Sequence, residues 1–475
     1  MKLTNLKKTA FALILLLTIT GTGLAQKNGK NGLVAERNVR AQMEFLASDA
    51  MQGRGSGTQF ELLAGLFIAS QLQQFGVEPA GDADASGNKT YIQTVNITRS
   101  SFAAAPKLSY SANGSNVVLE HGKEMIVLRI SAPQISGNLQ KINVDEKPQA
   151  GSIAFVRLRE GDAAQNLNQK LQTISAGGAK AVIVEETPQW RTQWENIAKR
   201  SLSFTTITGS AGNPFNLIVI GKDAANALSQ IVDGTNIEIK GELAAPQSQQ
   251  TWNAVGKLTG SDARLGSEVV LLSAHMDHVG VRQNAPGDDK IFNGADDDAS
   301  GCVAVLELSR LLASGKQPKR TVYFAFFGSE EAGGYGSRFF VDTLPFPKEK
   351  LIANLQFEMI GRPDPKVAAE ELWLTGYDRS NLGAELAKQG AKLVADPHPE
   401  QNFFQRSDNY TLARQGIVAH TVSSFGLHTD YHRASDELKT IDFKHMTQAI
   451  NSMVKPVQWL VNSDFKPVWH EGKKP

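Results

Sequence analysis

Short apolar runs alternate with stretches of helical spacing over the C-terminal half of the chain. The runs cover residues 269–273, 321–327, 352–358, 372–375 and 417–422. Strands that alternate with helices are typical of an α/β layered domain. We therefore expect a three-layer domain with a mixed, largely parallel central sheet.

The N-terminal part of the chain shows a different pattern. Residues 33–127 contain two amphipathic helical patterns on either side of a glycine-rich loop at 53–58, and the second pattern stops at Gly76. Residues 128–248 carry short β-like runs, such as 153–158 and 181–185, between glycine-rich turns. This texture predicts a smaller, β-rich domain inserted into the main one.

The first 25 residues have the layout of a secretory signal peptide. They combine three lysines, an apolar run at 10–19 and a small-residue exit at 22–25. A membrane anchor is the alternative, but the apolar run is shorter than a spanning helix needs. We expect an exported protein, periplasmic or extracellular, with no membrane contact after removal of the leader. The predicted organisation is 1–25 signal peptide, 26–127 first part of the main domain, 128–248 insert and 249–475 second part of the main domain.

Composition and charge exclude some classes of function. The 475 residues are 41% hydrophobic and 20% charged, as in a globular protein large enough for two domains. The formal net charge is +1 and becomes −2 without the three leader lysines, so no basic footprint for nucleic acid is present. A small or peptidic substrate fits better, and the oligomeric state is left open.

Cys302 is the single cysteine, so no intramolecular disulfide can form. It follows Gly301 at the start of an apolar helical pattern, which indicates a small core residue. Any metal ion must therefore be bound by histidine and carboxylate groups. Such ligands suit zinc or a harder divalent cation.

Residues of these types follow the apolar runs of the C-terminal half. Because the carboxyl ends of neighbouring parallel strands open onto one crevice, we expect these residues to converge there. The order along the chain is His275, Asp277 and His278, then Asp296-Asp297-Asp298, Glu330-Glu331, Glu358, and Tyr431-His432.

Each of these motifs also has a simpler interpretation. A His-x-Asp sequence can be a satisfied surface pair, three aspartates can form a solvated turn or a helix cap, and Glu-Glu can begin an exposed helix. Their occurrence in this order, at strand ends of one α/β segment, favours a shared metal site.

The same motifs resemble those of the co-catalytic dizinc aminopeptidases. This family includes bacterial leucyl aminopeptidases, glutamate carboxypeptidase and, without activity, the transferrin receptor. The motifs are His275-x-Asp277, Gly294-Ala-Asp296-Asp297-x-Ala-Ser-Gly301, Glu330-Glu331, Glu358-Met-Ile-Gly-Arg362 and Tyr431-His432. The resemblance extends to residues 45–55, which look like the family's opening helix and loop, and the 128–248 segment resembles its protease-associated (PA) insert.

The resemblance implies two zinc ions with a shared ligand. Asp296 would bridge them, His275 and Glu358 would complete one ion's shell, and Glu331 and His432 the other's. It also implies a cis peptide bond between Asp296 and Asp297. His278 and His428 are expected to orient neighbouring groups.

The implied activity is hydrolysis of the N-terminal peptide bond of a peptide with a free amino terminus. Water shared by the two zinc ions would have its pKa lowered to ~7. Glu330 would be the general base, Asp277 would fix the tautomer of the first metal-bound histidine, and Tyr431 would donate to the oxyanion. A carboxypeptidase or a glutaminyl cyclase on the same scaffold is the first alternative. A catalytically silent binding protein is the second.

The sequence departs from the family at Glu358, where many members have Asp. The extra methylene moves the carboxylate about 1.5 Å further from the backbone. Asp430 stands where proline is frequent, and its role is open. Arg406-Ser407-Asp408-Asn409 resembles a family segment that borders the substrate pocket, although a capped helix start explains it equally well.

Overall fold

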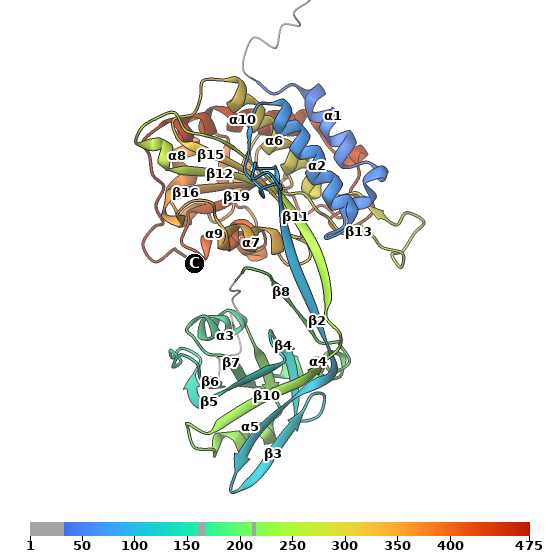
Figure 1. Ribbon diagram of the computed structural model, residues 1–475, viewed down its shortest axis with the longest axis vertical. Helices are drawn as coiled ribbons and strands as arrows, with labels where there is room; N and C mark the ends of the chain where they lie inside the picture. Colours follow the sequence, from blue (N-terminus) through green and yellow to red (C-terminus); the bar gives the residue numbers. More distant parts are fainter. Residues whose placement is uncertain (1–32, 160–166, 211–214) are drawn as a thin grey trace, which may run out of the picture.

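A computed structural model describes residues 33–159, 167–210 and 215–475, which form two bodies joined by long strands (Figure 1). The predicted signal peptide lies outside the described residues. Among the described helices, none combines the length and the apolar character needed to span a membrane.

The larger body is built on a mixed sheet with a parallel centre. The strands β15, β12, β16 and β19 are parallel, whereas β11 pairs antiparallel with β15, and β17 antiparallel with β19. This arrangement confirms the predicted fold class. In spatial order the strands are β1 (Glu78–Pro79), β11 (Gln247–Leu258), β15 (Thr321–Phe327), β12 (Val269–His275), β16 (Leu351–Phe357), β19 (Ala419–Ser423), β17 (Leu372–Leu374) and β18 (Leu393–Ala395).

Helices cover both faces of this sheet (Figure 1). Along β12, Val270 and Leu272 pack in the core that contains α1, α2, α6 and α10, whereas Val269 and Leu271 pack in the core that contains α7 and α9. Burial of both faces explains why the strand is apolar without interruption. The helices are α1 (Glu36–Leu46), α2 (Gln59–Gln74), α6 (Gly301–Ser314), α7 (Tyr335–Asp342), α8 (Leu382–Lys388), α9 (Asn409–Ala413) and α10 (Phe443–Asn462).

The smaller body is a second mixed sheet with its own cores. Its strands β5, β6, β7 and β9 are parallel neighbours, and β10, β2 and β3 continue the sheet in antiparallel pairs. The elements are β2 (Ile92–Ala112), β3 (Ser115–Glu120), β4 (Met125–Arg129), β5 (Gln134–Asn143), β6 (Ile153–Arg157), α3 (Leu167–Ala176), β7 (Ala181–Glu185), α4 (Pro188–Ala198), β9 (Leu217–Ile220), α5 (Lys222–Ser229) and β10 (Asn236–Leu243). The strand β8 (Ser203–Ile207) pairs with residues 97–101 of β2, in the part of β2 that joins the larger sheet.

The border between the two bodies lies within the long strand β2 (Figure 1). Residues 92–99 of β2 pair with β11 of the larger body, whereas residues from Phe102 onward pair with β10 of the smaller one. The predicted border at residue 128 is therefore too late. Because one uninterrupted strand belongs to both sheets, no turn residue marks the border between the two bodies in β2.

The parallel strands bring three chain segments to one edge of the larger sheet. His275 is the last residue of β12 and lies opposite Phe327, the last residue of β15. Ser273 of β12 lies opposite Gln356 of β16, which places Glu358 beside His275 at the same edge. The chain leaves β15 toward Glu330 and Glu331 from this edge as well.

Candidate metal centre

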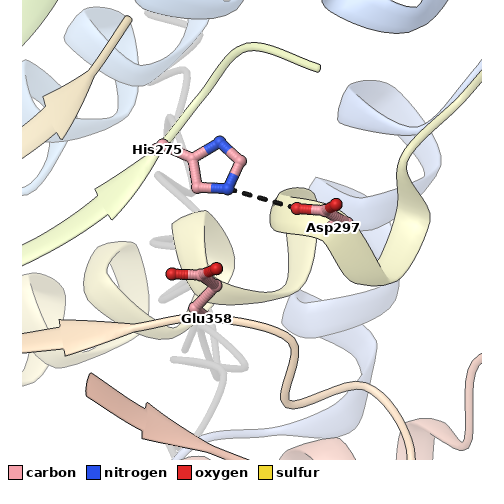
Figure 2. Close-up of side chains that lie close together, drawn as sticks. All are labelled: His275, Asp297 and Glu358. Carbon is pink, nitrogen blue, oxygen red and sulfur yellow. Dashed lines mark ion pairs between the residues drawn. The ribbon is translucent and has the colours of Figure 1, made fainter. Parts of the chain in front are cut away.

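Two groups of potential ligand atoms meet at the carboxyl ends of these strands. His275, Asp297 and Glu358 form the first group and His278, Asp297 and Glu331 the second, and within each group the ligand atoms lie within 4.8 Å of one another. Figure 2 shows the first group, in which the imidazole of His275 faces the Asp297 carboxylate and Glu358 approaches from the end of β16. Nε2 of His275 is 3.2 Å from Oδ1 of Asp297.

His432 reaches the second group from the loop after β19. Its Nε2 atom lies 2.9 Å from Oε1 of Glu331 and 3.2 Å from Oδ2 of Asp297. The structure thus brings together four of the five predicted ligands: His275, Glu331, Glu358 and His432. The longer side chain of Glu358 still reaches the group that contains His275.

The fifth predicted ligand, Asp296, faces another part of the protein. Its carboxylate accepts hydrogen bonds from the backbone N–H of Gly361 at 2.7 Å and pairs with Nε2 of His428 at 3.0 Å. Asp297 instead occupies the position shared by the two groups. The cis peptide bond likewise joins Asp297 to Asp298, one residue later than predicted. The expectation for this motif was wrong by one position.

The third aspartate of the motif, Asp298, fixes the backbone of the site. Its carboxylate accepts hydrogen bonds from the N–H groups of His275 at 3.1 Å, Gly301 at 3.0 Å and Met359 at 3.2 Å. It therefore ties the ends of β12 and β16 to the start of α6. Asp298 is fully buried, so these bonds satisfy a carboxylate that water does not reach.

Asp277 fixes the backbone of the turn that follows β15. Its Oδ1 atom accepts the N–H of Glu330 at 2.9 Å and its Oδ2 atom that of Glu331 at 3.3 Å. Nδ1 of His275 lies 3.2 Å from the backbone carbonyl oxygen of Asp277, and its distance to the carboxylate is longer, 3.6 Å. The carbonyl, rather than the predicted carboxylate, is thus the hydrogen-bond acceptor that orients His275.

Glu330 lies in a strongly acidic environment. Burial raises the pKa of Glu330 well above its usual range, and the nearby carboxylates of Asp408, Glu358 and Glu331 add to the rise. A carboxyl group with a raised pKa can accept and return a proton near neutral pH.

Glu61 supports the same loop and was not singled out in the sequence. Its buried carboxylate accepts hydrogen bonds from the N–H of Ser329 at 2.7 Å and from the hydroxyl of Thr251 at 2.8 Å. Ser329 has a φ of 53°, a left-handed conformation that is uncommon outside glycine. Glu61 and Asp277 thus hold the turn that carries Glu330 and Glu331. A lone acidic residue on a helix has no sequence signal that would reveal this role.

Arg54 is a second residue whose role the sequence does not reveal. Its guanidinium is fully buried and donates to the carbonyl oxygens of Met276 at 2.9 Å, Asn293 at 2.6 Å and Gly294 at 2.9 Å. A further bond reaches the carbonyl of Leu46 at 2.7 Å. Arg54 therefore joins the loop after β12 to the loop that carries Asp297.

We expect Arg54→Lys to lower the affinity of the centre for a divalent metal ion about 10–100-fold, as loss of an outer partner of a metal site does. Lysine keeps the charge but cannot reproduce the planar array of N–H donors. Arg320→Lys is the matched control, because Arg320 is equally buried but lies just before β15 and pairs with Glu268, just before β12. Competition with a chromophoric chelator measures both variants, and an equal loss in the two would contradict the assignment.

The donor atoms fit a pair of divalent cations. Oε1 of Glu331, Oε2 of Glu358 and both ring nitrogens of His278 are buried and have no hydrogen-bond partner among the described residues. Burial raises the pKa of Glu358 to about 7, with Asp297 contributing to the rise. Several buried carboxylates close together are unfavourable unless a positive charge compensates for them. Histidine nitrogen and carboxylate oxygen are ligands that zinc accepts.

A network behind the centre holds the loop that carries His432. Arg362 donates to Asp430 at 2.7 Å and to Asp436 at 2.9 Å. Asp436 in turn accepts the N–H of Asp297 at 3.1 Å. The open question about Asp430 is thereby answered: it anchors the loop to Arg362.

A mostly apolar pocket adjoins Glu358. The pocket is narrow, and its space amounts to about 380 Å³ only when the open solvent at its mouth is included. Tyr431 forms part of its wall and stacks on the ring of His432 with 3.9 Å between the ring centroids. Of the predicted 406–409 segment, Arg406 and Ser407 line the pocket. The remaining lining residues are Glu358, Met359, Trp373, Thr375, Phe403, Thr421, Ser423 and Phe425.

The C-terminal part of the chain is similar to known peptidases. Residues 253–457 match the family model described as Peptidase family M28. An aminopeptidase of Pseudomonas aeruginosa is 31% identical over 220 residues, which cover 45% of this chain and 35% of that protein. The match thus spans only about a third of this relative.

Two further similarities cover most of the chain. Aminopeptidase YwaD of Bacillus subtilis is 26% identical over 438 residues, covering 88% of this chain and 84% of that protein. The crystal structure of BSAP, a zinc aminopeptidase from Bacillus subtilis, aligns with 91% of this chain and 96% of its own at 21% identity and a TM-score of 0.47.

Proposed function

We propose, on the premise that the segment 253–457 belongs to peptidase family M28, that the protein is an exported, zinc-dependent aminopeptidase. The observation that supports this proposal best is the position of Asp297. Its carboxylate belongs to both groups of ligand atoms, as a residue shared by two cations must. The name of the relative that matches most of the chain, aminopeptidase YwaD, agrees with this activity.

We assign two zinc ions to the two groups. His275, Asp297 and Glu358 would hold one ion, and Asp297, Glu331 and His432 the other. When bound, the ions would lower the pKa of a shared water to ~7 and polarise the scissile carbonyl group.

The chain's own residues would move the protons. Glu330 would accept the proton of the attacking water and return it to the leaving amine. Its backbone is fixed by Asp277, and the turn before it by Glu61, so the carboxylate is held in place before substrate arrives. Tyr431, in the wall of the adjoining pocket, would donate its hydroxyl to the oxyanion.

The pocket beside Glu358 is suited to the side chain of the substrate's first residue. Met359, Trp373, Phe403 and Phe425 give it a predominantly apolar lining, so an apolar first residue would bury the most apolar surface there. We further propose that the smaller body is the PA insert expected from the 128–248 segment.

Two alternatives use the same scaffold. A carboxypeptidase needs a cationic group for the substrate's terminal carboxylate, and Arg362 is already engaged by Asp430 and Asp436. Arg406 at the pocket is the remaining arginine that was considered for this role. A silent binding protein would not need a base and a full ligand set, which this chain retains.

A substrate screen tests the proposal. Leucine 4-nitroanilide should be hydrolysed and its N-acetylated form should not, because the free amino group must lie beside the carboxylates of the centre. A chelator should abolish the activity and zinc should restore it. Cleavage of N-blocked peptides, activity that withstands removal of metal, or release of ammonia from peptides that begin with glutamine would contradict the proposal.

A further inference from the structure

His278 is a buried imidazole to which the mechanism above gives no role. The residue is 0% exposed, and neither ring nitrogen has a hydrogen-bond partner among the described residues. Its Nδ1 atom nevertheless lies 3.1 Å from Oε1 of Glu331 and 3.7 Å from Oδ2 of Asp297. Buried polar groups are normally paired, so an unpartnered imidazole beside two carboxylates needs an explanation.

A neighbouring pair shows what a hydrogen bond would look like at the same distance. Nε2 of His428 lies 3.0 Å from Oδ2 of Asp296, and the two atoms are hydrogen-bonded. His278 and Glu331 are equally close, but Nδ1 of His278 and Oε1 of Glu331 both lack a hydrogen-bond partner in the described residues. Close approach without a hydrogen bond is expected of ligands around one cation, because each lone pair points at the ion rather than at its neighbour.

His432 approaches the same two oxygens. Its Nε2 atom lies 2.9 Å from Oε1 of Glu331 and 3.2 Å from Oδ2 of Asp297. Donors in a tetrahedral zinc shell, with bonds of about 2.0–2.1 Å, lie roughly 3.3 Å apart. The distances from both imidazoles to the two carboxylate oxygens scatter around this value.

The backbone around His278 is shaped to place the ring there. The N–H of His278 donates to the carbonyl oxygen of Arg54 at 3.1 Å. The ring lies against Gly294, where a Cβ atom would come within 2.5 Å of the imidazole Cγ atom. The absence of a side chain at Gly294 therefore provides the room that the imidazole occupies.

We propose that His278 is a fourth protein ligand of the cation held by Asp297, Glu331 and His432. This inference rests on the metal centre of the proposed function. With four protein donors the cation at Glu331 would be the more firmly held, and the shared water would be its fifth ligand, whereas the position formed by His275, Asp297 and Glu358 offers three protein donors. The two cations should accordingly differ in affinity, with the one at Glu331 the tighter.

Metal affinity of the full chain, measured without reference to activity, tests this proposal. Zinc competition with a chromophoric chelator should show that His278→Ala weakens the tighter position by more than about 100-fold, beyond the loss expected for an outer partner. His278→Asn should weaken it similarly, because the amide keeps an N–H near the position of Nδ1 but is a poor zinc ligand. His428→Asn is the matched control and should change the affinity less than about tenfold.

Several outcomes would overturn the inference. A wild-type affinity in His278→Asn would show that His278 acts only as a hydrogen-bond donor, and a loss below about tenfold in His278→Ala would exclude a ligand role. Uptake of no metal by the wild-type protein would refute the proposed function together with the inference. Two bound ions with unchanged affinity in the variants would refute the inference alone.

A second experiment counts the histidine side chains that bind metal in the wild-type protein, so it does not depend on whether a variant folds. In the wild-type protein loaded with two equivalents of ¹¹³Cd²⁺, ¹H–¹¹³Cd correlation spectra should connect the metal to ring protons of His275, His278 and His432. Correlations to His275 and His432 alone would overturn the proposal.

Discussion

Glu330→Gln is expected to lower kcat about 10²–10⁴-fold, the usual contribution of a positioned general base, while two zinc ions remain bound. Glutamine has the same shape as glutamate but cannot accept a proton from water. Glu330 lies outside both groups of ligand atoms, so its replacement should leave the metal content unchanged. Steady-state kinetics with leucine 4-nitroanilide and elemental analysis of the same sample measure the two effects.

The adjacent residue provides the control for this prediction. Glu331→Gln changes the same chemical group one position later, within the group that contains His278 and Asp297. It should lose zinc as well as activity. Retained turnover in Glu330→Gln, or loss of metal from it, would remove Glu330 from the role of base.

Asp297→Asn is expected to deplete the protein of both zinc ions. The Asp297 carboxylate is common to the two groups of ligand atoms, so its neutral amide weakens both positions at once. The loss of affinity should exceed the about 10–100-fold that follows removal of an outer partner of a metal site. Elemental analysis after dialysis against a weak chelator measures the remaining zinc.

Asp296→Asn is the matched control for this second prediction. Its amide oxygen can still accept the N–H of Gly361, and its amide nitrogen can still pair with His428. Two zinc ions should therefore remain in this variant. A protein that loses its metal on replacement of Asp296 but keeps it on replacement of Asp297 would show that the original assignment of the bridge was right.

The architecture of the larger body followed from its apolar runs. Strands such as β12 and β15 are buried on both faces, so their sequences are apolar throughout and their ends are marked by polar residues. The border of the smaller body did not follow, because β2 continues from one sheet into the other. No glycine or proline lies between Arg99 and Phe102, where β2 makes this crossing.

The sequence predicted most of the ligand residues by position. In the aspartate motif it predicted only the residue type and not which aspartate is the ligand. His275 ends β12 and Glu358 directly follows β16, and the structure brings them together with Glu331 and His432. The Asp296-Asp297-Asp298 motif has three identical side chains, and the backbone path alone decides which of them faces the histidines. The residues that support the ligands could not be predicted from the sequence. Arg54 contacts carbonyl oxygens, which every residue possesses, so its partners have no sequence signature.

Zinc anomalous diffraction from crystals of the active protein tests the central claim most directly. The claim is that two cations share Asp297 in one crevice. We expect two anomalous peaks on either side of its carboxylate, one beside His275 and Glu358 and the other beside Glu331 and His432. A single peak, or peaks centred on Asp296, would contradict it.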